Sequence, residues 1–584
     1  MQRLQNCRIA RQGDSRVIKS ACCITLFVLL SPSVFGQSVT PCENLFAGYD
    51  QDTGAMGSTY EPMDSWVYPA MDRLYALGQI DTAYLGMRPW TRLSIVHILE
   101  AGSKKISDID EDSDACRIYQ ALQKEFEPDV ERLQDPRHPH AEIASVYTRF
   151  LGISGTPLRD SFHLGQTIVN DYGRPYQHGF NNLDGFSTPM GAGRFSFYFR
   201  GEYQYAPAAT GYSPGLTELL SENDGIPFAT NPSQDTIPLG PIPPTNHVRV
   251  VDAYASYLLL NHEISFGKND HWLGPAQGGS FAWSNNAENI YDFEIDRVEP
   301  LYVPLLSRLT GPFRYQFFVG SLQGHTDPNS PWVHVEKVSF KPTVNLELGF
   351  ERTVIWGGKD HVPITVGSFL KSFFSFQDVS AAEKVSRGDP GARFGTFDFS
   401  YRLPYMRNWL TLYADSLAHD DVSPISAPRR AGIRPGLYLS HFPGFHALDF
   451  RIEAADTDPP TSRSNAGQFL YWEQIQKQGY TNKGFIMGDW IGRESKGGQA
   501  WLTYHLSPSE QLQVSYRNAK AAKDFIPGGS TQNAFQFSTR KRFRKQFEVL
   551  GSVQYEGWKA PVYKQGKQND VSASAQITWY PKVK

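Results

Sequence analysis

The sequence predicts an all-β transmembrane barrel of the outer-membrane type, preceded by a small helical module. Three observations favour this fold class. The N-terminus reads as an export signal, the residues from about 141 onward alternate between apolar and polar side chains, and no apolar run long enough for a membrane helix follows residue 36. Strands in a membrane must close into a barrel, because lipid offers no partner to a free backbone N–H.

The first 36 residues have the pattern of a secretory signal peptide. Basic residues precede an apolar run at 21–30, which is too short to span a bilayer. Val34 and Gly36 are small residues at the positions that a signal peptidase reads, so we expect cleavage before Gln37. The sequence therefore divides into a signal peptide at 1–36, a tail with a periplasmic helical module at 37–140, and a barrel at 141–584.

Composition and charge limit the function classes. Aromatic residues make up 13% of the chain, which also contains 50 glycines and 39 prolines, a composition typical of strands and turns. The formal net charge is −4, and removal of the basic signal makes the remaining chain more acidic. Because a nucleic-acid binder needs a basic surface, we expect no nucleic-acid partner.

Two cysteines remain after the signal peptide. Cys42 and Cys116 could form a disulfide in an oxidising periplasm, and two separate thiols are the alternative.

Helical periodicity is confined to the region from Asp64 to about residue 134. Apolar residues recur at intervals of three and four from Val67 to Leu77, Asp64 is a suitable N-cap, and Gly78 ends the first helix. A second helix is expected to begin near Thr91. A third is expected around Ile118, Leu122 and Phe126.

Alternation with a period of two follows from about residue 141. Phe195, Phe197 and Phe199 share one face of a predicted strand, and Tyr198 and Arg200 share the other. The segments that alternate in this way are about 9 to 11 residues long, the length of a tilted strand that crosses a bilayer. The region from 141 to 584 has room for roughly 16 to 20 such strands with their connections.

The polar faces of these strands carry five arginines that we expect to point into the barrel: Arg194, Arg200, Arg314, Arg451 and Arg517. Arginine suits an acidic polysaccharide because its guanidinium pairs with carboxylates. The structural alternative is that each arginine pairs with an acidic residue on a neighbouring strand and fills the interior.

One stretch of the chain suggests a family. Residues 261–275 contain Gly267 and a Trp272-Leu273-Gly274-Pro275 turn, and Asn285-Asn286-Ala287 follows. Together with the Asp184-Gly185-Phe186 turn and the Pro-Trp-Thr-Arg run at 89–92, these residues resemble the capsule assembly Wzi family.

The resemblance implies a barrel of about 18 antiparallel strands in the outer membrane, with periplasmic helices. It further implies a non-catalytic lectin that anchors capsular or other exported polysaccharide at the cell surface. Sugars stack on aromatic rings, so Trp272 is a candidate contact, although a packed Trp in a tight turn explains the same motif. The implied partners are polysaccharide, outer-membrane lipid and the barrel-insertion machinery, and we expect a monomer.

Two other function classes remain open. A porin-like channel would conduct solute or polysaccharide, and the proline-rich stretch from Ala206 to Pro244 is long enough to be either a binding lid or a plug. An outer-membrane hydrolase is the third class, but no Gly-x-Ser-x-Gly or phosphate-loop motif is present. We expect no catalytic residues and no cofactor.

We also expect no metal. His262 and Glu263 point to opposite faces of a strand, and with Asp270 and His271 they match no familiar ligand spacing.

Overall fold

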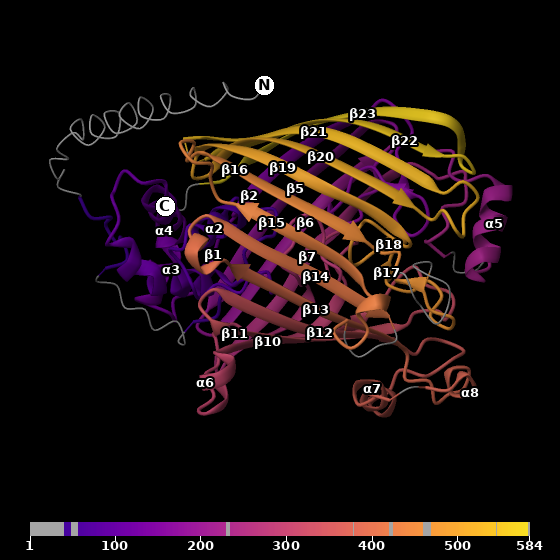
Figure 1. Ribbon diagram of the computed structural model, residues 1–584, viewed down its shortest axis with the longest axis horizontal. Coiled ribbons are helices and arrows are strands. Elements are labelled where there is room, and N and C mark those ends of the chain that lie inside the picture. Colours follow the sequence, from indigo (N-terminus) through magenta and orange to yellow (C-terminus); the bar gives the residue numbers. More distant parts are fainter. Residues whose placement is uncertain are drawn as a thin grey trace, which may run out of the picture.

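The structure is a computed structural model that describes residues 40–47, 56–228, 234–377, 379–419, 424–459, 469–544 and 546–581. The predicted signal peptide at 1–36 lies outside the described residues. Figure 1 shows a large barrel of tilted strands with a group of helices at one end. In the described part of the chain, no helix is long and apolar enough to cross a membrane.

The helical module consists of α2 (Val67–Ala76), α3 (Arg92–Ile106) and α4 (Asp114–Leu133). Thr91 caps α3 by accepting a hydrogen bond from the backbone N–H of Ser94, and Ser113 caps α4 in the same way. The three predicted helices are therefore present. The N-cap prediction for Asp64 is wrong: Trp66 is the N-cap of α2, and the Asp64 carboxylate instead pairs with Arg200 of the barrel.

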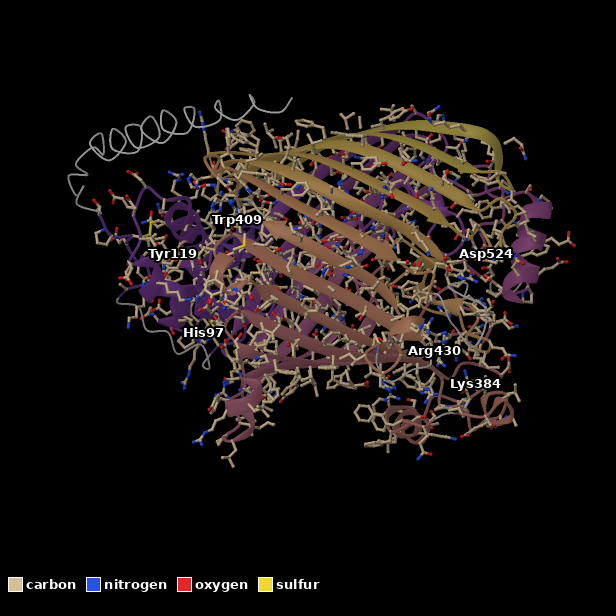
Figure 2. The ribbon with its side chains drawn as sticks, viewed as in Figure 1. His97, Tyr119, Lys384, Trp409, Arg430 and Asp524 are labelled. Carbon is tan, nitrogen blue, oxygen red and sulfur yellow. A yellow bond between two sulfur atoms is a disulfide. The ribbon has the colours of Figure 1, made fainter. Side chains whose placement is uncertain are left out.

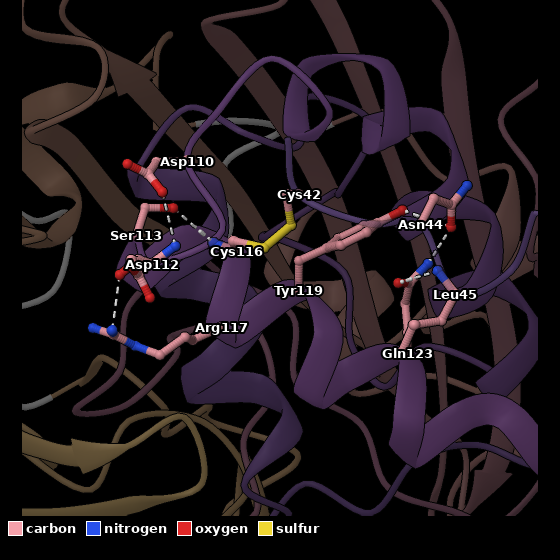
Figure 3. The surroundings of a disulfide bond; sticks show 10 residues. All are labelled: Cys42, Asn44, Leu45, Asp110, Asp112, Ser113, Cys116, Arg117, Tyr119 and Gln123. Atoms are coloured by element: carbon pink, nitrogen blue, oxygen red, sulfur yellow. Dashed lines mark hydrogen bonds between the residues drawn. A yellow bond between two sulfur atoms is a disulfide. The ribbon is translucent and has the colours of Figure 1, made fainter. Parts of the chain in front are cut away.

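A disulfide fixes the start of the described chain to this module. Figure 3 shows Cys42 bonded to Cys116 in the first turn of α4. Nearby, the Asn44 carboxamide oxygen accepts hydrogen bonds from the Tyr119 hydroxyl, at 3.3 Å, and from Gln123 Nε2, at 2.5 Å. The helices pack around a buried apolar core that includes Trp66, Leu99 and Phe126.

The predicted barrel is confirmed. One 19-stranded antiparallel sheet contains the short β1 (His140–Ala141), which pairs with β5 alone, and 18 strands that form a closed ring. The ring closes because β2 pairs with both β5 and β23. Its strands are β2 (Ser145–Ile153), β5 (Gly179–Ala192), β6 (Phe195–Ala206), β7 (Thr245–Leu259), β8 (His262–Lys268), β9 (Tyr291–Arg297), β10 (Phe313–Ser321), β11 (Trp332–Thr343), β12 (Leu346–Trp356), β13 (Ala392–Arg402), β14 (Leu410–His419), β15 (Gly432–Leu439), β16 (Leu448–Asp456), β19 (Ser495–Ser507), β20 (Glu510–Ala521), β21 (Ser530–Phe543), β22 (Phe547–Ala560) and β23 (Lys564–Trp579).

Alternation sets the two faces of the wall. On β6, Ser196, Tyr198 and Arg200 are buried inside, whereas Phe195 and Phe197 are exposed outside. This outer belt of aromatic and aliphatic side chains is the lipid-facing surface of an outer-membrane barrel.

The two ends of the barrel differ in their connections. Next to the helical module the turns are short, such as 193–194 and 344–345, apart from the connection that carries α6 (Leu306–Thr310). At the other end, long connections carry α5 (Pro214–Asp224), α7 (Val366–Phe373), α8 (Ala381–Lys384) and the hairpins β3 (Arg159–Asp160)–β4 (Gly165–Gln166) and β17 (Thr481–Asn482)–β18 (Phe485–Ile486). Short 3-10 helices are η2 (Pro404–Met406) and η3 (Pro428–Arg430).

This asymmetry orients the molecule. Outer-membrane barrels have short periplasmic turns and longer extracellular loops, so we expect the helical module at the periplasmic end and name the two ends accordingly. Figure 2 shows Tyr119 and Trp409 toward that end, with Lys384, Arg430 and Asp524 at the extracellular end.

Candidate functional site

Two segments of the chain occupy part of the barrel interior. Residues 269–290, between β8 and β9, are buried at every position except Gln277. This segment meets the periplasmic module, where Trp272 and Arg88 exchange backbone hydrogen bonds of 2.8 and 3.0 Å. Residues 469–494, between β16 and β19, lie beside it and are also largely buried. We call these two segments the plug.

The plug packs on an apolar inner wall in the extracellular half. Phe281, Trp283, Tyr480 and Trp490 belong to one buried cluster with the wall residue Phe318. The plug's backbone also bonds to carboxylates of the wall. Phe281 N–H donates to Asp415 at 2.7 Å, and Gly278 N–H donates to Glu453 at 3.0 Å.

The family-motif residues lie in this plug and its supporting strand. The Asn286 side chain accepts from the Asn170 N–H at 3.1 Å and donates to the Ile486 carbonyl at 3.0 Å, so it joins three distant segments. The backbone carbonyl of Asn285 accepts a hydrogen bond from the Tyr172 N–H. Gly267 has a φ of +148°, and a Cβ there would lie 2.1 Å from the Ala253 carbonyl oxygen.

The Trp-x-Gly-Pro turn is packed. Trp272 is 5% exposed, and its Nε1 donates to the Ala276 carbonyl at 3.1 Å. A Cβ on Gly274 would lie 2.5 Å from Ser280 Oγ, and Pro275 lies in the same turn. The structure leaves Trp272 no free ring face for a sugar, which favours the packed-turn interpretation.

Four of the five predicted arginines point inward and are buried. Arg314 pairs with Asp296 at 3.0 Å, Arg200 with Asp64 at 2.7 Å, Arg451 with Asp72 at 3.5 Å and Arg517 with Glu556 at 3.3 Å. These pairs agree with the structural alternative. Glycan contact by these side chains stays an untested prediction.

The placement of Arg194 in an inward row is wrong. Strand β6 begins at Phe195, and Arg194 is exposed in the turn that joins β5 to β6 at the periplasmic end. The sequence alternation runs one residue beyond the strand, so the pattern assigns Arg194 to the inward face. In the structure it lies in the turn, next to Gly193 with its φ of +58°.

Three cations surround one carboxylate near the extracellular end of the plug. Arg249 Nε lies 3.1 Å from Glu288 Oε2, and Lys483 Nζ lies 2.9 Å from Glu288 Oε1, which Lys268 Nζ also contacts. Burial favours the neutral form of Glu288, but Arg249, Lys268 and Lys483 outweigh it and lower its pKa. We call these four residues the Glu288 cluster.

Lys483 connects this cluster to solvent. Its side chain is 41% exposed, whereas those of Lys268 and Arg249 are 3% and 7% exposed. It occupies the tip of the β17–β18 hairpin, where its φ of +50° and the φ of +79° at Gly484 make the tight turn. The cluster has an excess of positive charge and one open member, so it can attract an anion from the extracellular side.

No pattern in the sequence indicates this cluster. Lys268 lies within the quoted family stretch, and Glu288 follows Asn285-Asn286-Ala287 directly. Lys483 is some two hundred residues away in the chain, and no local pattern connects it with them.

One buried group of side chains could offer ligand atoms to a metal. His271, Asp292 and Glu294 have such atoms within 4.8 Å of one another. Protein contacts already hold the group: His271 Nε2 lies 2.9 Å from Asp292, and Glu294 accepts from Ser265 and Asn269. Of the four residues considered together in the sequence, His262, Glu263, Asp270 and His271, only His271 belongs to this group. The expectation of no metal stays a prediction.

The ring of 18 strands, its lipid-facing belt and its internal plug define an outer-membrane barrel protein whose interior holds segments of its own chain. The family model described as capsule assembly protein Wzi matches residues 151–573, and the chain belongs to this family.

Two known proteins are similar to this chain, one in sequence and one in fold. The chain is 26% identical over 207 residues to an uncharacterized 55.8 kDa protein in the cps region of Klebsiella pneumoniae, which covers 35% of this chain and 40% of that protein. The fold of the present chain is similar to that of Wzi from Escherichia coli, an outer-membrane protein involved in group 1 capsule assembly and described as a carbohydrate-binding β-barrel. The two structures superpose with a TM-score of 0.63 at 18% sequence identity. The match covers 90% of this chain and 100% of E. coli Wzi.

Proposed function

We propose that this protein binds exported, acidic polysaccharide at its extracellular loop face and retains it at the outer membrane without chemical change. Membership of a capsule-assembly family supports the role. The observation that carries it is the Glu288 cluster, because three cations around one carboxylate at the outer end of the plug suit the carboxylates of an acidic polymer.

The first contact would be made by Lys483. It is the open member of the cluster, and the buried Arg249 and Lys268 contribute their charge from below. The interaction of one exposed ammonium with one carboxylate is weak, so retention would come from many sugar units meeting many copies of the protein.

The channel alternative has less support. A conducting lumen needs a continuous path, whereas the plug segments 269–290 and 469–494 are largely buried in the barrel. Within the stretch from Ala206 to Pro244, α5 lies at the extracellular end of the barrel, which supports the lid interpretation of this stretch over the plug.

Direct binding tests the proposal. The full chain in detergent is titrated against polygalacturonate, an acidic polysaccharide, and against dextran, a neutral one. We expect preference for the acidic polymer, with affinity reduced about two- to fivefold by Lys483→Gln. Lys496→Gln is the matched control, because Lys496 is an exposed lysine at the same end of the barrel. Equal binding of both polymers, or equal loss in both variants, would contradict this site.

A further inference from the structure

On the outer surface of β20 to β23, the side chains change from apolar to cationic toward the extracellular end. On β20, the outward positions are Val514, Tyr516, Asn518 and Lys520 in order. On β22, they are Val553, Tyr555, Gly557 and Lys559. Each strand thus passes from an aliphatic residue through an aromatic one to a lysine.

The pairing between neighbouring strands places residues of the same kind side by side across the wall. Phe535 on β21 is paired with both Tyr516 and Tyr555, so three aromatic residues stand in one row. In the next row toward the extracellular end, Asn533 is paired with Asn518 and with Gly557, and Gly557 is paired with Asn569.

Hydrogen bonds connect the aromatic row to the amide row. The Tyr516 hydroxyl donates to Asn533 Oδ1 at 2.9 Å, and the Tyr555 hydroxyl donates to Asn569 Oδ1 at 2.9 Å. Tyrosines with an apolar ring and a hydrogen-bonded hydroxyl mark the boundary between acyl chains and headgroups. The outer-leaflet boundary therefore runs along this row.

Lysines follow just beyond that boundary. Lys520 and Lys559 are both paired with the row of Thr531, one on each side. Lys567 of β23 lies against Gly557, where an added Cβ would be 2.9 Å from its Cε. All three lysines are exposed, and no ion pair involves them among the residues that the structure describes.

The height of the lysines fits a phosphate layer. Lys559 is four residues beyond Tyr555, which is about 13 Å along a strand and about 10 Å along the membrane normal after tilt. The three ammonium groups stand outside the barrel wall, above the apolar residues Val514, Phe537 and Val553.

We propose that Lys520, Lys559 and Lys567 bind the phosphate groups of lipid A in the outer leaflet, while its acyl chains lie on the aliphatic and aromatic rows below. Ammonium groups form charge-assisted hydrogen bonds with phosphate. The lysines face sideways into the leaflet from the wall, which favours a membrane glycolipid over a polymer held on the loop face. The site does not depend on the proposed function.

Lipid titration tests this site. The full chain in detergent is titrated with bisphosphorylated lipid A and with its dephosphorylated form, and bound lipid is counted by native mass spectrometry. We expect the wild type to prefer the phosphorylated lipid about tenfold, and Lys559→Gln with Lys567→Gln to remove that preference. Raising the ionic strength should weaken binding of the phosphorylated form alone. The control double variant, Lys104→Gln with Lys359→Gln, changes two exposed lysines elsewhere and should behave as the wild type.

Several results would overturn the proposal. Equal affinity for the two lipids would do so, as would an unchanged preference in the Lys559→Gln, Lys567→Gln variant. Loss of polygalacturonate binding with intact lipid A binding would assign the lysines to the polymer instead. If the double variant does not assemble, the single Lys520→Gln and Lys567→Gln variants provide the same comparison.

Discussion

The imidazole of His163 joins two extracellular loops: its Nε2 lies 2.7 Å from Asp224 Oδ2, at the end of α5, and its Nδ1 lies 2.8 Å from Asp160 in the β3–β4 hairpin. Arg493, from the plug, lies 3.0 Å from the other oxygen of Asp224. These four side chains are almost fully buried. They connect the lid helix to the rest of the extracellular end.

Alkaline pH should loosen this connection. Burial opposes the charged imidazole, but Asp160 and Asp224 outweigh it and raise the pKa of His163 from 6.5 to about 9. Because the folded-state pKa is the higher one, the stabilisation is complete below pH 6.5 and is lost as pH rises through about 9. Proteinase K cleavage within α5, normalised to an unstructured substrate at each pH, should therefore accelerate between pH 6.5 and 9. His163→Gln should cleave faster at low pH and show no step; a step that survives in this variant would rule out His163 as its cause.

Loss of the disulfide should destabilise the helical module and spare the barrel. Cys42 and Cys116 are separated by 74 residues, and closing a loop of that length is worth about 4 kcal/mol in the chain-entropy treatment. In Cys42→Ser with Cys116→Ser, hydrogen exchange across α3 and α4 should accelerate, with exchange in β20–β23 unchanged. Faster exchange throughout the barrel would show that the module and the wall unfold together.

Removal of the Arg314 side chain should lower the stability of the barrel and leave its affinity for polysaccharide unchanged. Arg314 and Asp296 are both nearly inaccessible, at 4% and 1% side-chain exposure. Arg314→Ala therefore leaves a buried carboxylate without its cation and should lower the free energy of unfolding by about 3–5 kcal/mol. Arg200→Ala should cost less, because the Asp64 side chain is 34% exposed. Urea denaturation measures the cost, and Arg194→Ala, in its exposed turn, is the matched control. Weaker polygalacturonate binding by an assembled, stable Arg314→Ala barrel would support the sequence-based prediction of glycan contact instead.

Deletion of residues 60–135 should leave strands that still close into a barrel, because their backbone hydrogen bonds are made within the ring. The shortened barrel should be less stable than the full chain. Glu347 accepts from the backbone N–H groups of Leu85 and Gly86, and Arg402 pairs with Asp81, so deletion leaves both wall residues without these partners. Heat-modifiable migration in gels measures closure, and the urea midpoint measures stability. A chain that never shows the folded band would make the helices part of the barrel fold.

The wall was predictable from sequence because each strand separates lipid from a polar interior, and that difference repeats at every second residue. Phe195 to Arg200 shows it over a few residues. The plug was not predictable, because 269–290 has no repeating pattern and is held by partners from β14, β16 and the helical module.

The candidate site was hidden for the same reason. The members of the Glu288 cluster come from β7, β8, the segment before β9 and the β17–β18 hairpin, and only the folded chain brings them together. The alternation predicted the inward position of the buried arginines. It could not predict their acidic partners, because these depend on the register between strands and on the position of the helical module.

The role in retention is tested most directly in the native host by deleting the gene and measuring cell-bound, released and total polysaccharide. The deletion strain is complemented with the wild type, Lys483→Gln or Lys496→Gln, with each barrel checked for assembly. We expect total polysaccharide to stay level while polymer moves from cells to medium in the deletion strain, with full rescue by the wild type and Lys496→Gln and partial rescue by Lys483→Gln. Unchanged attachment in the deletion strain would contradict the anchoring role, and a fall in total polysaccharide without release would favour a part in export.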